Sequence, residues 1–234
     1  MQLSPRGKTV IIHVGAHSTA DALELSRHAS QAGAHAISSL PPAGNYSFVE
    51  IREYYRVLAA ESDVPLLIYY FPSLAPAIKT TDQVLELCGL PNVAGIKFTD
   101  SDFFRLWAIR RSGSIVFNGS DEMLVAGLVM GANGGIGSIY NLVPEQFVAL
   151  YEHTVAGRWE EARRIQNHIN ELIEVILRYP VNASVKAILG WSGIECGKPI
   201  APRRALTERE QTELQTAVAG TVLGREILAL QPRG

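Results

Sequence analysis

The feature that most constrains the fold is a repeated alternation of short apolar runs with longer amphipathic stretches. Six runs have the length and β-branched content of buried strands, and they begin near residues 9, 34, 65, 93, 114 and 134. The stretches between them carry apolar residues at three- and four-residue spacing, which is typical of a helix with one buried face. Strands that are apolar on both faces and alternate with helices are parallel, so the pattern predicts an α/β fold.

Two architectures share this alternation, a doubly wound sheet and a (β/α)8 barrel. A doubly wound sheet that binds a dinucleotide carries its glycine fingerprint between a strand and the next helix. The glycine-dense run Gly134-Gly-Ile-Gly137 opens a strand instead, so it is not such a fingerprint. Glycines in a strand indicate that another group approaches the backbone closely, and we expect a ligand at this run.

Composition excludes several classes of function. The chain has 234 residues, of which 47% are hydrophobic and 19% charged, so a sizeable core is expected and disorder is not. The 21 basic and 23 acidic residues form no basic block, which argues against a nucleic-acid partner. Cys88 and Cys196 lack metal-ligand spacing, so we expect buried thiols in a reducing compartment. Without a signal core or a membrane-length apolar run, we expect a cytoplasmic protein with no membrane partner.

Lys97 lies inside one apolar strand, and Tyr69 lies near the end of the strand before it. Burial disfavours a charged ammonium group, and the neutral amine that results is the nucleophile required for a Schiff base with a carbonyl substrate. A neighbouring tyrosine can transfer protons in the same reaction. The alternative is a lysine on an edge strand that extends to solvent, beside an ordinary core tyrosine.

Polar and glycine residues gather late in the predicted strands or just after them, and they are Tyr69, Lys97, Thr99, Gly119, Asp121 and Ser138. Active sites of parallel α/β folds form at that edge of the sheet, from several strands. Each residue also has a structural explanation. Acidic residues such as Asp121 and Glu122 favour a helix N-terminus, a glycine can turn the chain, and hydroxyls are common at strand ends. His13 and His35 lie in apolar strands, and we expect them to be core histidines with satisfied hydrogen bonds.

Five blocks carry a resemblance to a known family, and they are His13-Val-Gly-Ala16, Tyr69-Tyr-Phe-Pro72, Gly95-Ile-Lys-Phe-Thr99, Asn118-Gly-Ser-Asp-Glu122 and Gly134-Gly-Ile-Gly-Ser-Ile-Tyr-Asn141. Their order and spacing resemble those of the N-acetylneuraminate lyase and dihydrodipicolinate synthase family of pyruvate-dependent aldolases. The resemblance covers essentially the whole chain. It implies a TIM-type (β/α)8 barrel with extra C-terminal helices, which usually assembles as a homotetramer.

The resemblance also implies roles for individual residues, without a metal or a diffusible cofactor. Lys97 would form the Schiff base with pyruvate or the 2-keto acid, and Tyr69 would exchange the proton during carbon–carbon cleavage. Thr99 would lie beside the reacting centre. The residues implied to bind the polyol part of a sugar acid are Gly119, Asp121, Glu122 and Ser138.

Smaller sequence features indicate which subgroup of the family this chain resembles. Synthases of the family carry an arginine shortly after the proline of the tyrosine motif, whereas Pro72-Ser-Leu-Ala75 has none. Asp121-Glu122 and Phe98-Thr-Asp100 are more similar to the sialic acid lyases. We therefore expect cleavage of N-acetylneuraminate to N-acetylmannosamine and pyruvate, with another 2-keto acid aldolase or a synthase-like aldolase as the alternative.

Two departures from the family pattern remain. The sequence shows six strand–helix units, which match strands 3 to 8 of the family, and it lacks the loop that holds the pyruvate carboxylate. We therefore expect a partial barrel over 1–142, with the last barrel helix and a helical extension over 143–234 in the same domain. An incomplete barrel also allows an inactive family member that serves as a binding or assembly subunit. The loop Pro41-Pro-Ala-Gly-Asn45 lacks the family's interface tyrosine, and Tyr46 is out of register.

Overall fold

The computed structural model describes residues 7–229, which divide into two compact units. The first, here called the sheet unit, runs to Ser120 and also includes Met130–Gly135. The second, the helical unit, consists of Asp121–Val129 and the chain from Ile136 onward. The expected division at residue 142 stays a prediction.

The sheet unit contains six parallel strands, β1 (Ile11–His13), β2 (Ala36–Ser39), β3 (Leu66–Tyr70), β4 (Val93–Phe98), β5 (Ile115–Asn118) and β6 (Gly134–Gly135). Each strand pairs with the one before it, so the order in space is the order in sequence. A doubly wound sheet reverses its strand order near the middle, whereas a barrel adds strands in one direction. The prediction of a partial (β/α) barrel with additional C-terminal helices is therefore confirmed.

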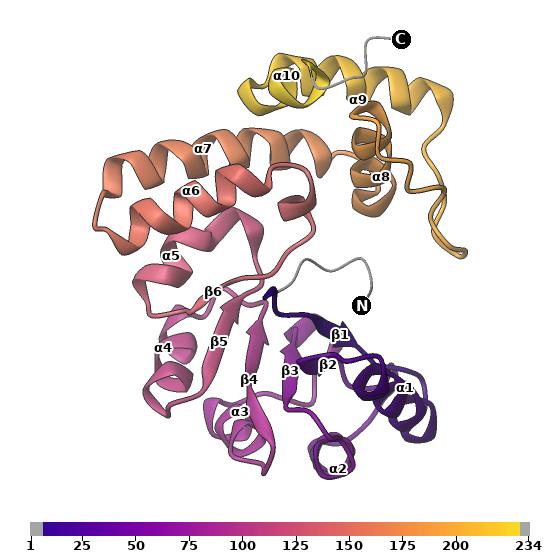
Figure 1. Cartoon of the computed structure of the whole chain (residues 1–234), viewed down its shortest axis with the longest axis vertical. Coiled ribbons are helices and arrows are strands. Elements are labelled where there is room, and N and C mark those ends of the chain that lie inside the picture. The colour runs from indigo at the N-terminus through magenta and orange to yellow at the C-terminus, as the bar shows by residue number, and fades with distance from the viewer. Residues whose placement is uncertain (1–6, 230–234) are drawn as a thin grey trace. The chain divides into compact units, whose positions relative to one another are not determined.

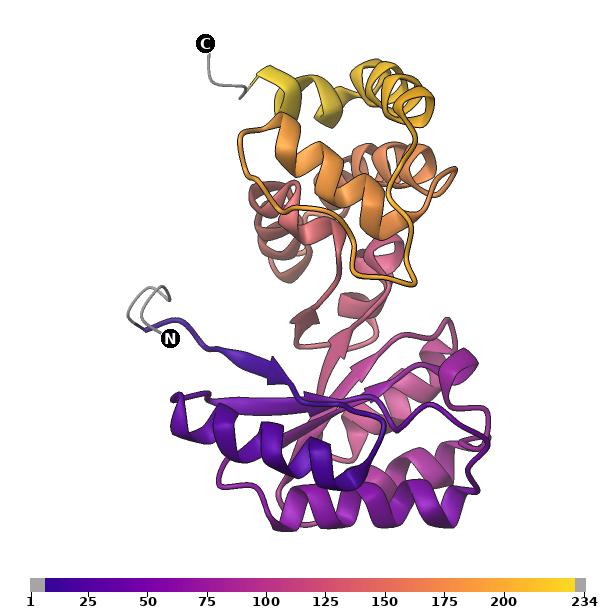
Figure 2. The same ribbon diagram turned by 90° about the vertical axis from the view of Figure 1, so that its right-hand side faces the viewer.

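The helices of the sheet unit are α1 (Thr19–Gln31), α2 (Phe48–Ala60), α3 (Thr81–Cys88) and α4 (Phe103–Arg111), with a short 3-10 helix, η1 (Pro72–Leu74), after β3. Their starts follow the local sequence. The sequence predicts Ser47 and Glu50 as a capping box and Thr80 as a helix cap. The structure confirms both, since Ser47 and Glu50 cap α2 and Thr80 caps α3 together with Gln83. Figure 1 shows these four helices on the outer side of the sheet, and Figure 2 shows the same layer from another side.

Strand alternation decides which side chains reach the two faces of the sheet. Ile68, Tyr70, Ile96 and Phe98 are fully buried in the core between the sheet and its helices. Residues of the other parity, such as Lys97, point to the opposite face, which in a barrel is the interior. The core therefore holds β3 and β4 firmly while their polar side chains remain available.

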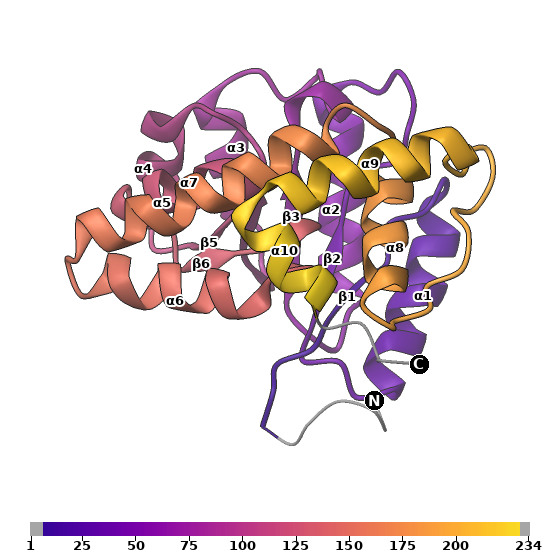
Figure 3. The same cartoon turned by 90° about the horizontal axis from the view of Figure 1, so that it is seen from above.

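The helical unit contains η2 (Asp121–Met123), α5 (Leu124–Val129), η3 (Ile139–Asn141), α6 (Pro144–Val155), α7 (Trp159–Ile176), α8 (Val181–Trp191), α9 (Glu208–Gly220) and α10 (Val222–Ala229). Helices α6 and α7 lie side by side, as Figure 3 shows from above. The buried stripe of α7, which includes Ile169 and Leu172, packs into a second hydrophobic core with α6, α8 and α9. Among residues 7–229 no helix is both long and apolar enough to cross a membrane.

Two predicted elements differ from the structure. The strand expected over 134–141 is only two residues long and is followed by η3, whose first N–H donates to the Asp121 carboxylate instead of a neighbouring strand. The sequence from about residue 207 predicts one last helix, whereas the structure has two, because the backbone becomes extended at Thr221. Both differences involve hydrogen bonds of polar side chains, Asp121 and Thr221, that the apolar pattern does not encode.

Candidate active site

Lys97 and Tyr69 are direct neighbours on the adjacent strands β4 and β3. The ammonium nitrogen of Lys97 lies 3.8 Å from the centroid of the Tyr69 ring, over its face. The negative face of an aromatic ring attracts a cation, so this contact orients the lysine side chain. Lys97 is partly buried, and β4 lies between β3 and β5. The alternative of a lysine on an edge strand is therefore wrong.

The two consecutive tyrosines of β3 have different environments. Tyr70 faces the helices, where its hydroxyl accepts a hydrogen bond from Arg105 and lies 3.5 Å from the Asp100 carboxylate. Burial raises the pKa of Tyr70, and the charge of Arg105 opposes that effect. Tyr69 lies on the other face, partly exposed, with its ring parallel to that of Phe71. Of the two tyrosines, only Tyr69 is next to the lysine.

Thr99 and Gly119 lie together at the end of the same sheet. Thr99 is two residues beyond Lys97, and its Oγ1 is buried without a hydrogen-bond partner among residues 7–229. A Cβ atom at Gly119 would lie only 2.0 Å from that oxygen, so the absence of a side chain at Gly119 allows the approach. Buried hydroxyls are nearly always hydrogen-bonded, so this oxygen is unusual among the residues that the structure describes.

His13 also belongs to this region. Its ring meets the Tyr69 ring edge-on, with 6.3 Å between centroids, and its Nε2 accepts the Leu40 N–H at 3.2 Å. Neighbouring side chains desolvate the ring although much of it stays exposed, and this desolvation, and secondly the charge of Lys97, lower the pKa of His13. Because Nε2 accepts a hydrogen bond, the neutral ring carries its proton on Nδ1. The expectation of two core histidines is wrong, because His13 and His35 are both exposed, although each accepts a backbone N–H. His13 is the last residue of β1, and residues at strand ends are candidates for the active site of a parallel sheet. The apolar residues around His13 in the sequence indicated a core position instead.

Asp121 is buried at the start of the helical unit and organises the chain around Ser138. Its Oδ2 accepts the Ile139 N–H at 2.8 Å, and its backbone carbonyl accepts a hydrogen bond from Gln166. A Cβ atom at Gly137 would fall 1.4 Å from Asp121 Oδ1, so only glycine fits there without rearrangement. The carboxylate thus fixes the backbone on both sides of Ser138.

Glu122 and Ser138 are both exposed. The backbone carbonyl of Glu122 accepts a hydrogen bond from Asn170, and that of Ser138 accepts one from Asn141. The Glu122 carboxylate and the Ser138 hydroxyl are not used in these bonds. The predicted site residues thus fall into two groups. Tyr69, Lys97, Thr99 and Gly119 gather in the sheet unit, and the other three gather in the helical unit.

Within residues 7–229, no three or more His, Cys, Asp and Glu side chains are grouped so as to hold a metal ion. Both cysteines are free thiols. Cys88 is buried as expected, whereas Cys196 is partly exposed, which the sequence did not indicate.

Comparison with known proteins agrees with this fold. Residues 7–220 match the model of the dihydrodipicolinate synthetase family. The chain is 43% identical over 221 residues to an N-acetylneuraminate lyase of Rhizobium meliloti, covering 93% of this chain and 74% of that protein. Wild-type sialic acid aldolase of Ruminococcus gnavus matches with a TM-score of 0.88 and 31% identity, over 98% of this chain and 77% of that one. A catalytic lysine mutant of the same aldolase matches with a TM-score of 0.85 and 31% identity, over 95% and 73%.

The partial barrel and these relatives define an enzyme class, the carbon–carbon lyases of the Schiff-base aldolase type. The chain belongs to the dihydrodipicolinate synthetase family, as the sequence motifs predicted.

Proposed function

We propose that the protein cleaves N-acetylneuraminate to N-acetylmannosamine and pyruvate, with Lys97 as the Schiff-base lysine. The observation that carries the proposal is the contact between the Lys97 amine and the Tyr69 ring on neighbouring strands. Lysine and tyrosine at this edge of a parallel sheet supply the nucleophile and the proton carrier that a retro-aldol reaction needs. The similarity to proteins named as N-acetylneuraminate lyase and sialic acid aldolase supports the choice of substrate.

The reaction requires four balanced steps. The neutral Lys97 amine attacks the C2 carbonyl of the open-chain sugar acid. The Tyr69 hydroxyl gives up its proton as water leaves, which yields a protonated imine and a Tyr69 phenolate. The phenolate accepts the proton of the C4 hydroxyl while the C3–C4 bond breaks, and the electron pair moves into the iminium as an enamine. N-Acetylmannosamine leaves as the aldehyde. Tyr69 then returns a proton to C3, and one water molecule hydrolyses the imine to release pyruvate and the neutral amine. The proton freed by this hydrolysis restores the Tyr69 hydroxyl.

The other site residues take binding roles in this proposal. The Thr99 hydroxyl, which is buried beside Lys97, hydrogen-bonds the reacting end of the substrate. Gly119 leaves the space that this hydroxyl occupies. Residues that bind the polyol chain are Asp121, Glu122 and Ser138. The segment that contains η1, Pro72-Ser-Leu-Ala75, has no arginine such as synthases of the family carry after this proline, which favours a lyase over a synthase.

Two further properties belong to the same proposal. The family resemblance supports a homotetramer whose small-molecule partners are pyruvate and a 2-keto acid or sugar acid. The composition supports a cytoplasmic enzyme, since both thiols are free. Sedimentation of the purified protein tests the first property, and fractionation of its native cells tests the second.

The test is borohydride reduction of the purified 234-residue protein with pyruvate, followed by intact mass and peptide mapping. We expect one adduct, at Lys97, and its loss in Lys97→Ala. Lys79→Ala is the matched control, because Lys79 is an exposed lysine of the same unit. Tyr69→Phe should still form the adduct but release pyruvate from N-acetylneuraminate about 10²–10⁴-fold more slowly. An adduct that persists in Lys97→Ala would refute the assignment.

A further inference from the structure

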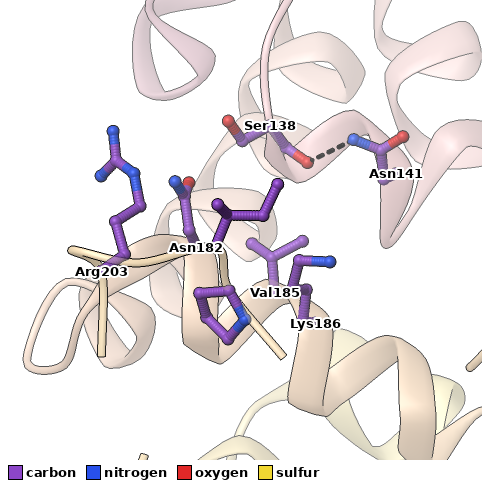
Figure 4. Close-up of a pocket in the computed structure, with 8 residues that line it drawn as sticks. Ser138, Asn141, Asn182, Val185, Lys186 and Arg203 are labelled. Atoms are coloured by element: carbon purple, nitrogen blue, oxygen red, sulfur yellow. Dashed lines mark hydrogen bonds between the residues drawn. The ribbon is translucent and has the colours of Figure 1, made fainter. Parts of the chain in front are cut away.

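The helical unit contains a pocket of about 380 Å³, formed by the end of η3, the first turns of α8 and the loop after α8. Figure 4 shows its lining, with Ser138 and Asn141 on one side, Asn182, Val185 and Lys186 of α8 on the other, and Arg203 at its edge. Pro199 and Ile200 complete it. The volume suits a small ligand or one end of a larger one.

Charge distinguishes this pocket from an ordinary surface hollow. Two of its lining residues, Lys186 and Arg203, are cationic, and no Asp or Glu of the described chain lines it. The other polar lining residues offer a hydroxyl and two carboxamides, which donate hydrogen bonds without adding negative charge. The charged side chains that line the pocket are therefore both cationic.

Neither cation is neutralised within residues 7–229. The Lys186 ammonium donates to the carbonyl oxygen of Cys196 at 2.5 Å, a contact that fixes its position without cancelling its charge. Lys186 is also partly buried, which makes an unpaired charge costly. Arg203 forms no ion pair in the described chain, whereas its neighbour Arg204 is paired with Glu210 through two hydrogen bonds of 2.7 Å.

We propose that this pocket is a binding site for an oxyanion, either a carboxylate or a phosphate group, held by Arg203 and Lys186. The planar guanidinium of Arg203 matches two oxygens of such a group, and the ammonium supplies a second, fixed positive charge. Ser138 and Asn182 provide neutral groups beside the anion. The apolar side chains of Val185 and Ile200 exclude some of the water that would otherwise screen these charges.

The oxyanion has two sources that share this chemistry, a free inorganic ion and the anionic group of a larger metabolite. The apolar lining beside the cations favours the metabolite, because an isolated inorganic ion has no group to place there. The pocket shares Ser138 with the polyol-binding residues proposed above, but the inference does not require the lyase activity. It is tested by binding alone.

Isothermal titration calorimetry of the full chain at low ionic strength, with inorganic phosphate and then glucose 6-phosphate as probes, tests the proposal. We expect saturable binding that weakens by about tenfold or more in Arg203→Gln, since a charge-assisted hydrogen bond is lost. Lys186→Gln should weaken binding too, while its amide can still donate to Cys196. Arg204→Gln is the matched control, because it removes the same charge from the next residue, outside the pocket.

Each outcome decides the question. Binding that is lost in Arg203→Gln and retained within about twofold in Arg204→Gln supports a site; tighter binding of the sugar phosphate identifies a metabolite as the source. Equal weakening in both arginine variants would indicate diffuse surface charge and overturn the proposal. The wild-type protein binding neither probe would overturn it as well. Melting curves without phosphate establish that the variants are folded, which we expect because the Arg203 side chain is exposed.

Discussion

Gly95 begins the Gly-Ile-Lys motif, and the structure gives a steric reason for glycine there. A Cβ atom at this position would lie 2.0 Å from the backbone oxygen of Ile115 and 2.7 Å from its carbonyl carbon. Ile115 is the register partner of Gly95 on β5. Because the obstructing atoms belong to the backbone, no side-chain rotation relieves the clash, and Gly95→Ala must push β4 and β5 apart.

The magnitude follows from the distances. Restoring ordinary contact requires a separation larger by about 1 Å or more at the register pair, which breaks ladder hydrogen bonds near it. Overpacking costs about 1–3 kcal/mol, and each weakened hydrogen bond costs about 1 kcal/mol. We expect Gly95→Ala to lower the free energy of unfolding by about 2–4 kcal/mol, which in a chain of this size lowers the melting temperature by roughly 5–15 °C.

Gly134→Ala provides the control, since Gly134 lies in the same sheet and its added Cβ would meet Phe117 at an ordinary 3.5 Å. It should change stability by less than about 1 kcal/mol. Lys97 is two residues from Gly95, so its displacement should also slow borohydride trapping of pyruvate by about 10²-fold in Gly95→Ala alone. Both variants are compared by thermal melting and by the rate of adduct formation. Equal melting temperatures and trapping rates for the two variants would refute the steric argument.

Two further predictions concern ionisable groups. Burial raises the pKa of the Cys88 thiol to about 12, so iodoacetamide at mildly alkaline pH should modify the partly exposed Cys196 first, and mass spectrometry should find Cys88 labelled only after denaturation. Hydrogen bonds from Arg204, and then from the Thr207 N–H, lower the pKa of Glu210 from 4.5 to about 2. Because the folded pKa is the lower one, Glu210 stabilises the protein above pH 4.5, and the stability difference between wild type and Glu210→Ala in urea should vanish as the pH falls from 4.5 to about 2.

Most of the fold could be predicted because it depends on local and periodic signals. Apolar runs located all six strands, and capping residues such as Ser47 and Thr80 placed helix starts to within a residue. The division between α9 and α10 could not be predicted in this way. It depends on Thr221, whose Oγ1 donates to the Val218 carbonyl and accepts the Gly224 N–H, and a change of backbone direction at one polar residue leaves the apolar spacing intact.

The sequence could predict those site residues whose location follows from their position along a strand. Tyr69 and Lys97 were placed together because both occur late in neighbouring strands, and the register confirms that placement. The environment of Tyr70 could not be predicted from the sequence, because its hydroxyl is hydrogen-bonded by Arg105, which lies 35 residues away on a helix. Such contacts depend on how a helix packs on the sheet. An apolar pattern indicates which face of the helix is buried, but not which polar group of the sheet a side chain of the helix contacts.

The glycine-dense run after β5 shows how the same signal can have two physical origins. Closely spaced glycines indicated that a ligand approaches the backbone. At Gly137 the group that approaches is part of the protein, the Asp121 carboxylate, which lies within 1.4 Å of where a Cβ atom would be. Because the Asp121 carboxylate accepts a hydrogen bond from the Ile139 N–H, it has a structural role in addition to the proposed contact with sugar hydroxyls. Asp121 therefore shapes the segment that presents Ser138, and Glu122, whose side chain is exposed, is the better candidate of the two for direct contact with a polyol.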